Sequence, residues 1–216
     1  SQPVLNRYPR LAATIVYNGN IYLKADGSLA VINTNRNSSP DGYGFSSDCT
    51  PTGYYFKKYW DKDHRESLNS GLNVILIRYA DVLLMHAEAA AETGTLDEAT
   101  WNKTIKLLRQ RAGFTKAEAL NFPAAGSAEL IEIVRRERRS ELAFEGLRHK
   151  DIMRWKIAET VLNGYCHGLY TGDAIGTDNG FVRVENRSFD NTKHYLLPIP
   201  RNERDLNSNL TQNPNW

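Results

Sequence analysis

The strongest constraint on the fold is a periodic apolar pattern between residues 74 and 113 that glycine interrupts twice. From Ile75 onward, apolar residues recur at the spacing of one helix face, at positions 75, 76, 79, 82, 83, 86 or 87, and 90. Gly94 follows where a helix C-terminus favours glycine. Thr95 and Glu98 then match a capping box that would begin a second helix, which Gly113 would end. The expected apolar face of that second helix comprises Trp101, Ile105, Leu108 and Ala112. Because the connecting turn is short, the two helices should lie antiparallel.

The segment from Tyr79 to Gly113 matches about one unit of the helix-turn-helix repeat called TPR. Small residues at positions 87, 90 and 99 would let the two backbones approach closely. Only one clear copy is present, whereas about three units are needed to bury a continuous core. We therefore expect these helices to continue an array outside this chain or to pack on another element.

Three segments differ in texture. Residues 1–73 have the character of strands and loops, residues 74–163 that of TPR-like helices, and residues 164–216 that of loops. We predict a mostly α fold with small β-hairpins and long loops, with an α+β fold as the alternative.

Individual elements can also be placed. The β-branched segment Leu11–Tyr17 reaches the turn signal Asn18-Gly19, so Ile21–Leu23 could return as its hairpin partner. Further helices are expected over 127–144 and 150–162. The prolines in Tyr195–Pro200 indicate an extended segment that cannot be a central strand.

The helix expected over 127–144 carries Glu137 and Glu141 on the stripe that should be buried. A buried charge requires partners, and Arg78 and Arg148 are candidates. Together with Glu145, these carboxylates could form a glycosidase-like acid and base pair. We favour a structural ion-pair cluster, because glutamates four residues apart lie only about 6 Å from each other. Nearby arginines would also keep all of them ionised.

Charge and composition argue against several classes of function. Lys and Arg number 27 against 25 Asp and Glu, net +2, and mean hydropathy is −0.53, so neither nucleic-acid binding nor a membrane span is expected. The first residues, 1–10, lack the pattern of a signal peptide. The five histidines do not recur at metal-ligand spacing and no phosphate-binding loop is present, so we predict no metal site and no cofactor.

Two points remain open from the sequence. Loop aspartates at positions 41, 48, 61, 63 and 173 could gather around a calcium ion, although no EF-hand spacing supports such a site. Cys49 and Cys166 could form one disulfide or remain two free thiols.

Aromatic residues in polar loops are the candidate ligand-binding groups, because Tyr and Trp rings stack on sugar rings while neighbouring polar groups bind the hydroxyls. The candidates are Tyr43, Trp60, Tyr165 and Tyr170. For Tyr54, Tyr55 and Tyr59 we favour a packing role, because their alternation is strand-like.

The order of motifs along the chain resembles the C-terminal region of the SusD/RagB family. The segments that carry the resemblance are Tyr8–Leu11, Arg78–Glu88, Leu108–Gly113, Glu137–Arg148, Asp151–Trp155, Tyr195–Glu203 and Gln212–Pro214. Members of that family are outer-membrane lipoproteins of Bacteroidetes that bind glycans or other nutrients and cap a SusC-like TonB-dependent transporter.

The resemblance implies one SusD-like C-terminal domain, with the lipid anchor and most TPR helices in an N-terminal part outside this chain. It implies a non-enzymatic protein on the extracellular face of the outer membrane that delivers oligosaccharide to the transporter. Family ligand residues lie in variable loops, so the resemblance assigns none here. A TPR-type interaction scaffold and, less favoured, a glycoside hydrolase remain alternatives.

Overall fold

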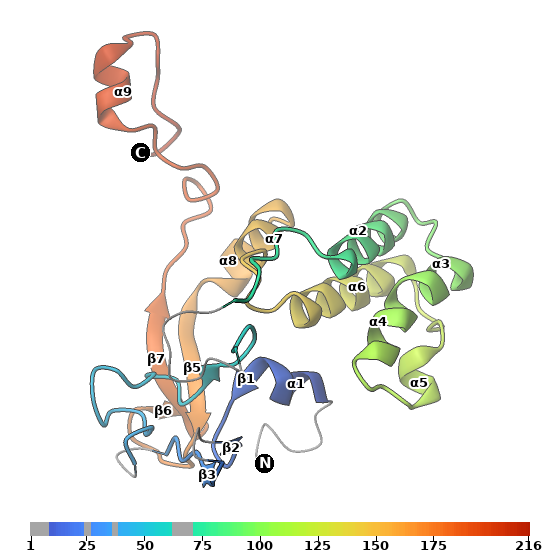
Figure 1. The fold of residues 1–216 in the computed structure, drawn as a ribbon. Coiled ribbons are helices and arrows are strands. Elements are labelled where there is room, and N and C mark those ends of the chain that lie inside the picture. The colour runs from blue at the N-terminus through green and yellow to red at the C-terminus, as the bar shows by residue number, and fades with distance from the viewer. Residues whose placement is uncertain (1–8, 24–26, 36–38, 62–70) are drawn as a thin grey trace. The chain divides into compact units, whose positions relative to one another are not determined.

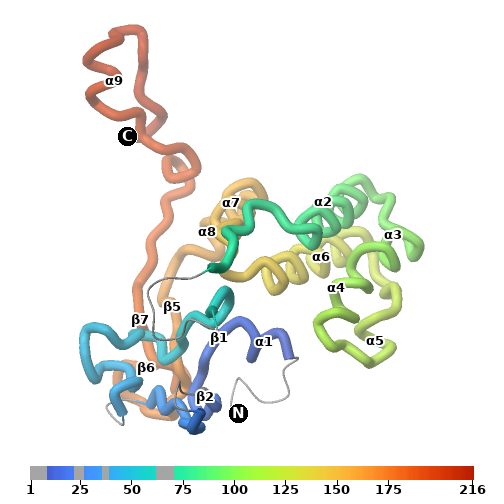
Figure 2. Tube along the Cα trace, viewed as in Figure 1, coloured from blue at the N-terminus to red at the C-terminus, as the bar shows by residue number. Residues whose placement is uncertain are grey.

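A computed structural model describes residues 9–23, 27–35, 39–61 and 71–216. Figures 1 and 2 trace them from the N-terminus to the C-terminus. The chain divides into two compact units, Ser1–Gly146 and Leu147–Trp216. The predicted class, mostly α with small hairpins, is confirmed. Within the described ranges, no helix combines the length and the apolar character that crossing a bilayer requires. Residues Tyr8, Asp63 and His64 of the sequence patterns lie outside the described residues.

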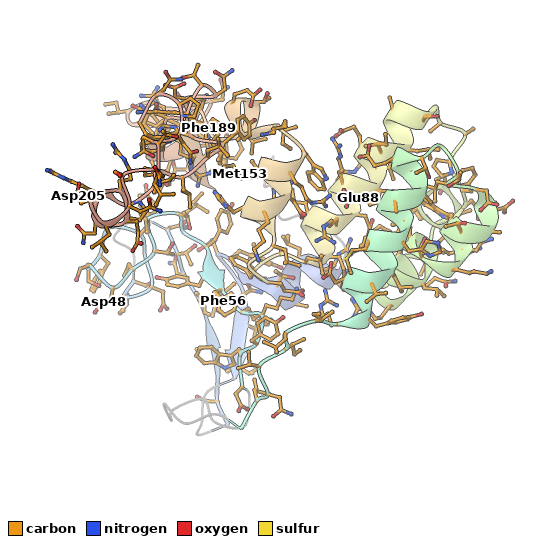
Figure 3. The ribbon with its side chains drawn as sticks, turned by 90° about the horizontal axis from the view of Figure 1, so that it is seen from above. Asp48, Phe56, Glu88, Met153, Phe189 and Asp205 are labelled. Carbon is orange, nitrogen blue, oxygen red and sulfur yellow. The ribbon has the colours of Figure 1, made fainter. Side chains whose placement is uncertain are left out.

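The first unit opens with a short helix and two small antiparallel sheets. Helix α1 (Pro9–Thr14) begins at a proline, which suits the first turn of a helix because its missing N–H would be unpaired there. Strand β1 (Ile15–Val16) pairs with β4 (Tyr55–Phe56), and β2 (Ile21–Leu23) pairs with β3 (Leu29–Val31). Phe56, labelled in Figure 3, packs edge-on against Phe144 with the ring centroids 5.1 Å apart.

The predicted hairpin between Leu11–Tyr17 and Ile21–Leu23 is therefore wrong. The turn itself exists, because the Asn20 N–H donates to the Tyr17 carbonyl at 3.0 Å. Residues 11–14 belong to α1, however, and β2 pairs instead with β3, which is nearer in the sequence.

Five helices follow in the first unit. They are α2 (Tyr79–Glu92), α3 (Glu98–Lys103), α4 (Ile105–Arg111), α5 (Ala117–Leu120) and α6 (Ser127–Glu141). Helices α2 and α6 lie side by side (Figure 1), and α2 packs against α6 more extensively than against α3 or α4. The core includes the fully buried Leu84, Trp101, Ile105 and Val134. The Trp101 indole donates to the Leu120 carbonyl at 2.8 Å, so its one polar atom is paired.

Several predicted helix boundaries require correction. Helix α2 begins at Tyr79 rather than near Ile75, and Leu76 before it is 90% exposed. Asp97, not Thr95, caps α3, because its carboxylate accepts from the Thr100 N–H at 2.8 Å. Helix α6 ends at Glu141, before Phe144 with φ +63°.

The glycine stops and three of the four apolar positions of the second helix were predicted correctly, whereas Ala112 is half-buried and follows the end of α4. Gly94 and Gly113 adopt φ +70° and +83° just after α2 and α4, where a side chain would be strained. Trp101, Ile105 and Leu108 are buried together. The predicted single helix is divided at Thr104 into α3 and α4.

The second unit contains helices α7 (Arg148–Arg154), α8 (Ala158–Val161) and α9 (Arg201–Leu206) and a three-stranded antiparallel sheet. Its strands are β5 (Gly164–Tyr170), β6 (Thr177–Asp178) and β7 (Phe181–Arg187), in the order β5-β7-β6. The expected single helix over 150–162 is interrupted where Lys156 adopts φ +54°. The loop texture expected after residue 164 was also wrong for the sheet: Asn179 and Gly180, both at positive φ, form the tight turn between β6 and β7.

Candidate functional site

Helix α6 and the turn after it place three carboxylates in a row in the first unit. Glu137 and Glu141 lie one helical turn apart on the buried face, and Glu145 follows in the turn. Such groups are stable away from water only when cations and hydrogen-bond donors surround them. The positions of the basic residues on other elements therefore decide what the carboxylates can do.

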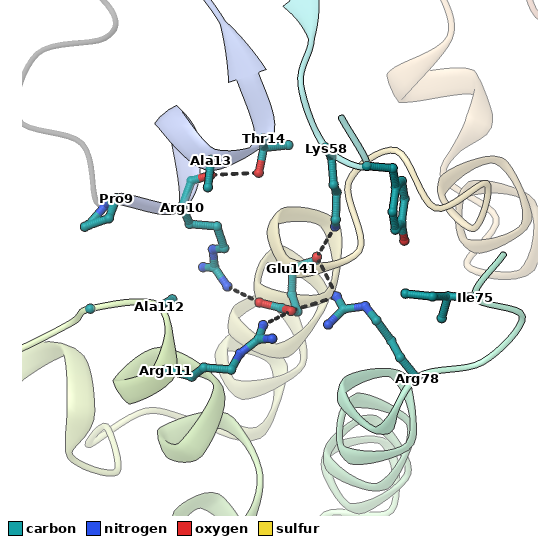
Figure 4. A pocket seen from close by; sticks show the side chains of 12 residues that line it. Pro9, Arg10, Ala13, Thr14, Lys58, Ile75, Arg78, Arg111, Ala112 and Glu141 are labelled. Carbon is teal, nitrogen blue, oxygen red and sulfur yellow. Dashed lines mark hydrogen bonds and ion pairs between the residues drawn. The ribbon is translucent and has the colours of Figure 1, made fainter. Parts of the chain in front are cut away.

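Glu141 receives three guanidinium groups from three separate parts of the chain (Figure 4). Arg10 of α1 approaches one carboxylate oxygen, with Nη1 2.9 Å from Oε2. Arg78, just before α2, places Nη2 2.7 Å from Oε1, and Arg111 at the end of α4 bonds the same oxygen. The carboxylate is thus fixed by the elements around it.

The other two carboxylates are held in the same way. Glu137 accepts from Arg10 Nη1 at 2.9 Å and from Arg109 Nε at 2.7 Å. Glu145 accepts from Lys58 Nζ at 2.5 Å and from Arg78 Nε at 2.8 and 2.9 Å. The predicted structural ion-pair cluster is confirmed, with Arg78 as a partner. Arg148, the other proposed partner, lies over the Trp155 ring at 5.7 Å in the second unit.

The cations determine the protonation of this cluster. Burial alone would raise the pKa of Glu141, but hydrogen bonds from Arg78 and Arg10 outweigh it and lower that pKa. For Glu145, burial is likewise outweighed by Arg78 and Lys58, and the pKa is again lowered. Both groups are therefore ionised at neutral pH, which suits structural carboxylates and not a general acid.

Two open cavities flank the cluster. One, of about 480 Å³, is lined by Arg10, Lys58, Tyr59, Ile75, Arg78, Arg111 and Glu141, among others. The second, of about 660 Å³, is lined by Arg109, Phe114, Lys116, Glu118, Arg136 and Glu137, among others. Each is large enough to hold one or more sugar-sized groups.

The predicted aromatic candidates fall in both units. Tyr43 and Trp60 belong to the first, where Trp60 is 53% exposed and Tyr43 is half-buried. Tyr165 and Tyr170 lie near opposite ends of β5 in the second, and both are exposed. Neither pair lines either cavity described above. The ligand-binding role of these four residues remains a prediction.

The β5–β7 surface joins one of these aromatics to charged groups. Arg183 lies 5.2 Å over the Tyr165 ring and also bonds Asp178, which accepts from His167 Nε2 at 2.8 Å. Hydrogen bonds from Arg183 and His167 lower the pKa of Asp178 to about 2. Tyr170 instead packs edge-on against Phe181, with centroids 5.1 Å apart, which favours a structural role for that ring.

Tyr59 is a further candidate for ligand binding, although its sequence context favoured a packing role. Strand β4 ends at Phe56, so the alternation that suggested a strand does not reach Tyr59. Tyr59 adopts φ +66°, is 42% exposed and lines the cavity beside Glu141. No local sequence signal marks this position, because the cavity is made by residues distant in the chain.

The structure shows whether the two cysteines form a disulfide and whether potential metal ligands gather. Cys49 and Cys166 are both free thiols. Among the described residues, no three His, Cys, Asp or Glu side chains gather as a metal site would require. Asp63 of the proposed calcium group lies outside those residues.

Comparison with known proteins identifies the family. The SusD family model matches residues 1–216. The SusD-like proteins P2 and P25 of Formosa agariphila are 36% and 30% identical over 149 and 160 residues, which is 67% and 73% of this chain. The chain therefore belongs to the SusD family. It spans only 26% and 27% of those two relatives.

Solved structures of SusD-like proteins support the same family assignment. A SusD-like protein of Bacteroides fragilis superposes with a TM-score of 0.77 at 30% identity, covering 99% of this chain and 40% of the other. A SusD-like carbohydrate-binding protein of the same species gives a TM-score of 0.73 at 32% identity, covering 96% and 42%.

Proposed function

We propose that this protein binds oligosaccharide at the extracellular face of the outer membrane, without cleaving it, and delivers it to a SusC-like TonB-dependent transporter. The family match over residues 1–216 carries the proposal. The carbohydrate-binding protein of B. fragilis supports it, because it is 32% identical and has a similar fold over 96% of this chain. The binding is expected to be modest, with dissociation constants from micromolar to millimolar, or roughly −8 to −4 kcal/mol.

The state of the carboxylates supports a binding role over hydrolysis. A glycosidase requires one carboxyl group with a raised pKa and a second, free carboxylate, about 5 Å or 6.5–9.5 Å apart across a cleft. Here Glu137, Glu141 and Glu145 are each bound by two or more cationic groups, and the pKa values of the last two are lowered. We therefore expect the helices to serve as a scaffold. The groups that contact the ligand should lie on the loops, on the β5–β7 surface and at the edges of the two cavities.

Affinity electrophoresis against a panel of polysaccharides, with release of reducing ends assayed alongside, tests binding and hydrolysis together. Retarded migration without cleavage is the expected result. Cleavage would instead support a hydrolase. Absence of both would favour an interaction scaffold built on the helices.

Delivery to a transporter needs a separate test in the native organism. The intact protein, carrying an affinity tag, should co-purify with a TonB-dependent outer-membrane protein. Deleting its gene should slow growth on the glycan that it binds while leaving growth on glucose unchanged. Normal growth of the deletion strain on that glycan, without a co-purifying transporter, would contradict the delivery role.

A further inference from the structure

We propose that the cavity beside Glu141 binds the oxyanion of an acidic oligosaccharide, either a uronate carboxylate or a sulfate ester. This inference rests on the proposed glycan-binding function and names a ligand class and a site for it. The cavity, of about 480 Å³, is lined by the cations Arg10, Lys58, Arg78 and Arg111 and by one carboxylate, Glu141. Figure 4 shows Arg10, Arg78 and Arg111 reaching Glu141 from different elements.

The charge of the whole cluster supports this assignment. Three carboxylates, Glu137, Glu141 and Glu145, contact the five cations Arg10, Lys58, Arg78, Arg109 and Arg111. The cluster therefore has two more positive than negative charges. Because most of these side chains are largely removed from solvent, water screens the excess charge weakly. A bound anion would neutralise it.

Arg111 has the geometry to contact such an anion. Its side chain is 60% exposed, and among the described residues Glu141 is the one partner that it bonds, through Nη2. A guanidinium carries five N–H donors in a planar fork, so several remain to bind a second oxyanion bidentately. Glu141 keeps Arg10 and Arg78 as partners whether or not Arg111 also binds a ligand.

Tyr59 adds an aromatic ring at the same cavity. It is 42% exposed and is held at φ +66°, a backbone conformation that side chains other than glycine and asparagine rarely adopt. Such strain recurs at ligand-binding sites, where the surrounding structure enforces it. Burial, reinforced by Glu145, raises the pKa of Tyr59, so its hydroxyl stays protonated and can donate to a sugar oxygen. The ring and the guanidinium together would recognise the pyranose and its charged substituent.

The test uses the intact protein and three variants, measured by isothermal titration calorimetry. Arg111→Gln removes the exposed guanidinium, and Tyr59→Asn removes the ring while keeping a residue suited to positive φ. Arg136→Gln is the matched control, because it removes one positive charge from the other cavity. The probes are tetragalacturonate, a sulfated carrageenan tetrasaccharide and neutral maltotetraose. The first two distinguish a carboxylate from a sulfate ester.

We expect at least one acidic probe to bind about tenfold more tightly than maltotetraose, with an affinity that falls as salt rises. Arg111→Gln and Tyr59→Asn should each weaken that binding about tenfold. Arg136→Gln should change it less than about twofold, and all variants should keep Tm within about 2 °C of the parent protein.

Each of the following results would overturn the proposal. If Arg111→Gln binds the acidic probe as the parent does, or if maltotetraose binds as tightly, the acidic site is wrong while the proposed glycan binding stands. If Arg111→Gln lowers Tm by more than about 2 °C, Tyr59→Asn decides, and unchanged affinity of that variant for the acidic probe overturns the proposed site. If the intact protein binds none of these probes and is not retarded by any polysaccharide, the proposed function itself fails.

Discussion

The Nε atom of Arg78 lies 2.9 Å from Oε1 and 2.8 Å from Oε2 of Glu145. This contact ties the residue that precedes α2 to the turn that follows α6, and Arg78 Nη2 extends it to Glu141 at 2.7 Å. One guanidinium therefore joins the start of the first long helix to the end of the last one in this unit. Ion pairs of Arg78 thus stabilise the α2–α6 packing beside its apolar core.

Removing the charge at the centre of the cluster should destabilise the first unit. Glu141→Gln leaves Arg10, Arg78 and Arg111 without their shared carboxylate, and breaking a buried ion pair from one side costs about 3–5 kcal/mol. The free energy of unfolding, measured by urea titration, should fall by that amount.

Glu132→Gln is the control for that measurement. Its side chain is 72% exposed and pairs with Arg135 at 3.4 Å, so a change within about 0.5 kcal/mol is expected. Equal effects of the two substitutions would show that the buried cluster contributes no more than a surface ion pair.

Stability should also depend on pH through Glu141 and Glu145. Their pKa values in the folded protein lie below the usual 4.5. The unfolded chain therefore takes up protons first as the pH falls, and stability falls with it. The contribution is fully present above about pH 4.5 and is lost as the pH drops through the lower folded values.

Urea titrations of the parent protein and of Glu145→Gln at several pH values between about 3 and 7 test this dependence. Below about pH 4.5 the free energy of unfolding should fall more steeply for the parent, because the variant lacks one titrating carboxylate. Identical slopes would mean that the pKa of Glu145 is the same in the folded and unfolded chains.

The cap of α3 offers a test between Asp97 and Thr95, two residues apart. Asp97 accepts from the Thr100 N–H, so Asp97→Ala removes the cap and should lower Tm by a few degrees. Thr95 is exposed and bonds Thr93 and the Ala90 carbonyl, so Thr95→Ala should lower Tm less. If Thr95→Ala lowered Tm more than Asp97→Ala in thermal denaturation, Thr95 would be the cap, as the sequence predicted.

Trp60 and Tyr170 should respond differently to substitution by alanine. Trp60 is more than half exposed, so Trp60→Ala should leave Tm nearly unchanged and, if its ring stacks on sugar, weaken glycan binding about tenfold. Tyr170 packs on Phe181, and its ring lies so close to Gly180 that an added Cβ there would meet it at 2.5 Å. Tyr170→Ala should therefore lower Tm without a matching loss of affinity, and unchanged binding by both variants would remove these positions from the site.

The carboxylate cluster was predictable from sequence because a local pattern carried it. Glu137 and Glu141 fall on the apolar stripe of a helix, and a buried charge demands a counter-charge. Their partners were only partly predictable: Arg78 was named, whereas Arg10 and Lys58 come from segments whose approach depends on the tertiary fold. The cavity and the role of Tyr59 depend on the same distant contacts.

Strand pairing was less predictable than helix content. The strand β1 has only two residues, and its partner β4 lies about forty residues further along, so no local signal specifies that pair. The β6–β7 turn is different, because Asn179-Gly180 is a strong hairpin signal between short strands that the overall loop-like composition concealed.

Binding without cleavage is tested most directly by measuring both activities on one sample. The intact protein is incubated with the polysaccharide that retards it in affinity electrophoresis, and reducing ends are followed over time beside a Glu141→Gln variant. We expect retardation by that polysaccharide and no release of reducing ends above the buffer control. Sustained release of reducing ends by the parent protein would contradict binding without cleavage. Loss of that release in a Glu141→Gln variant shown to be folded would then identify Glu141 as a catalytic residue.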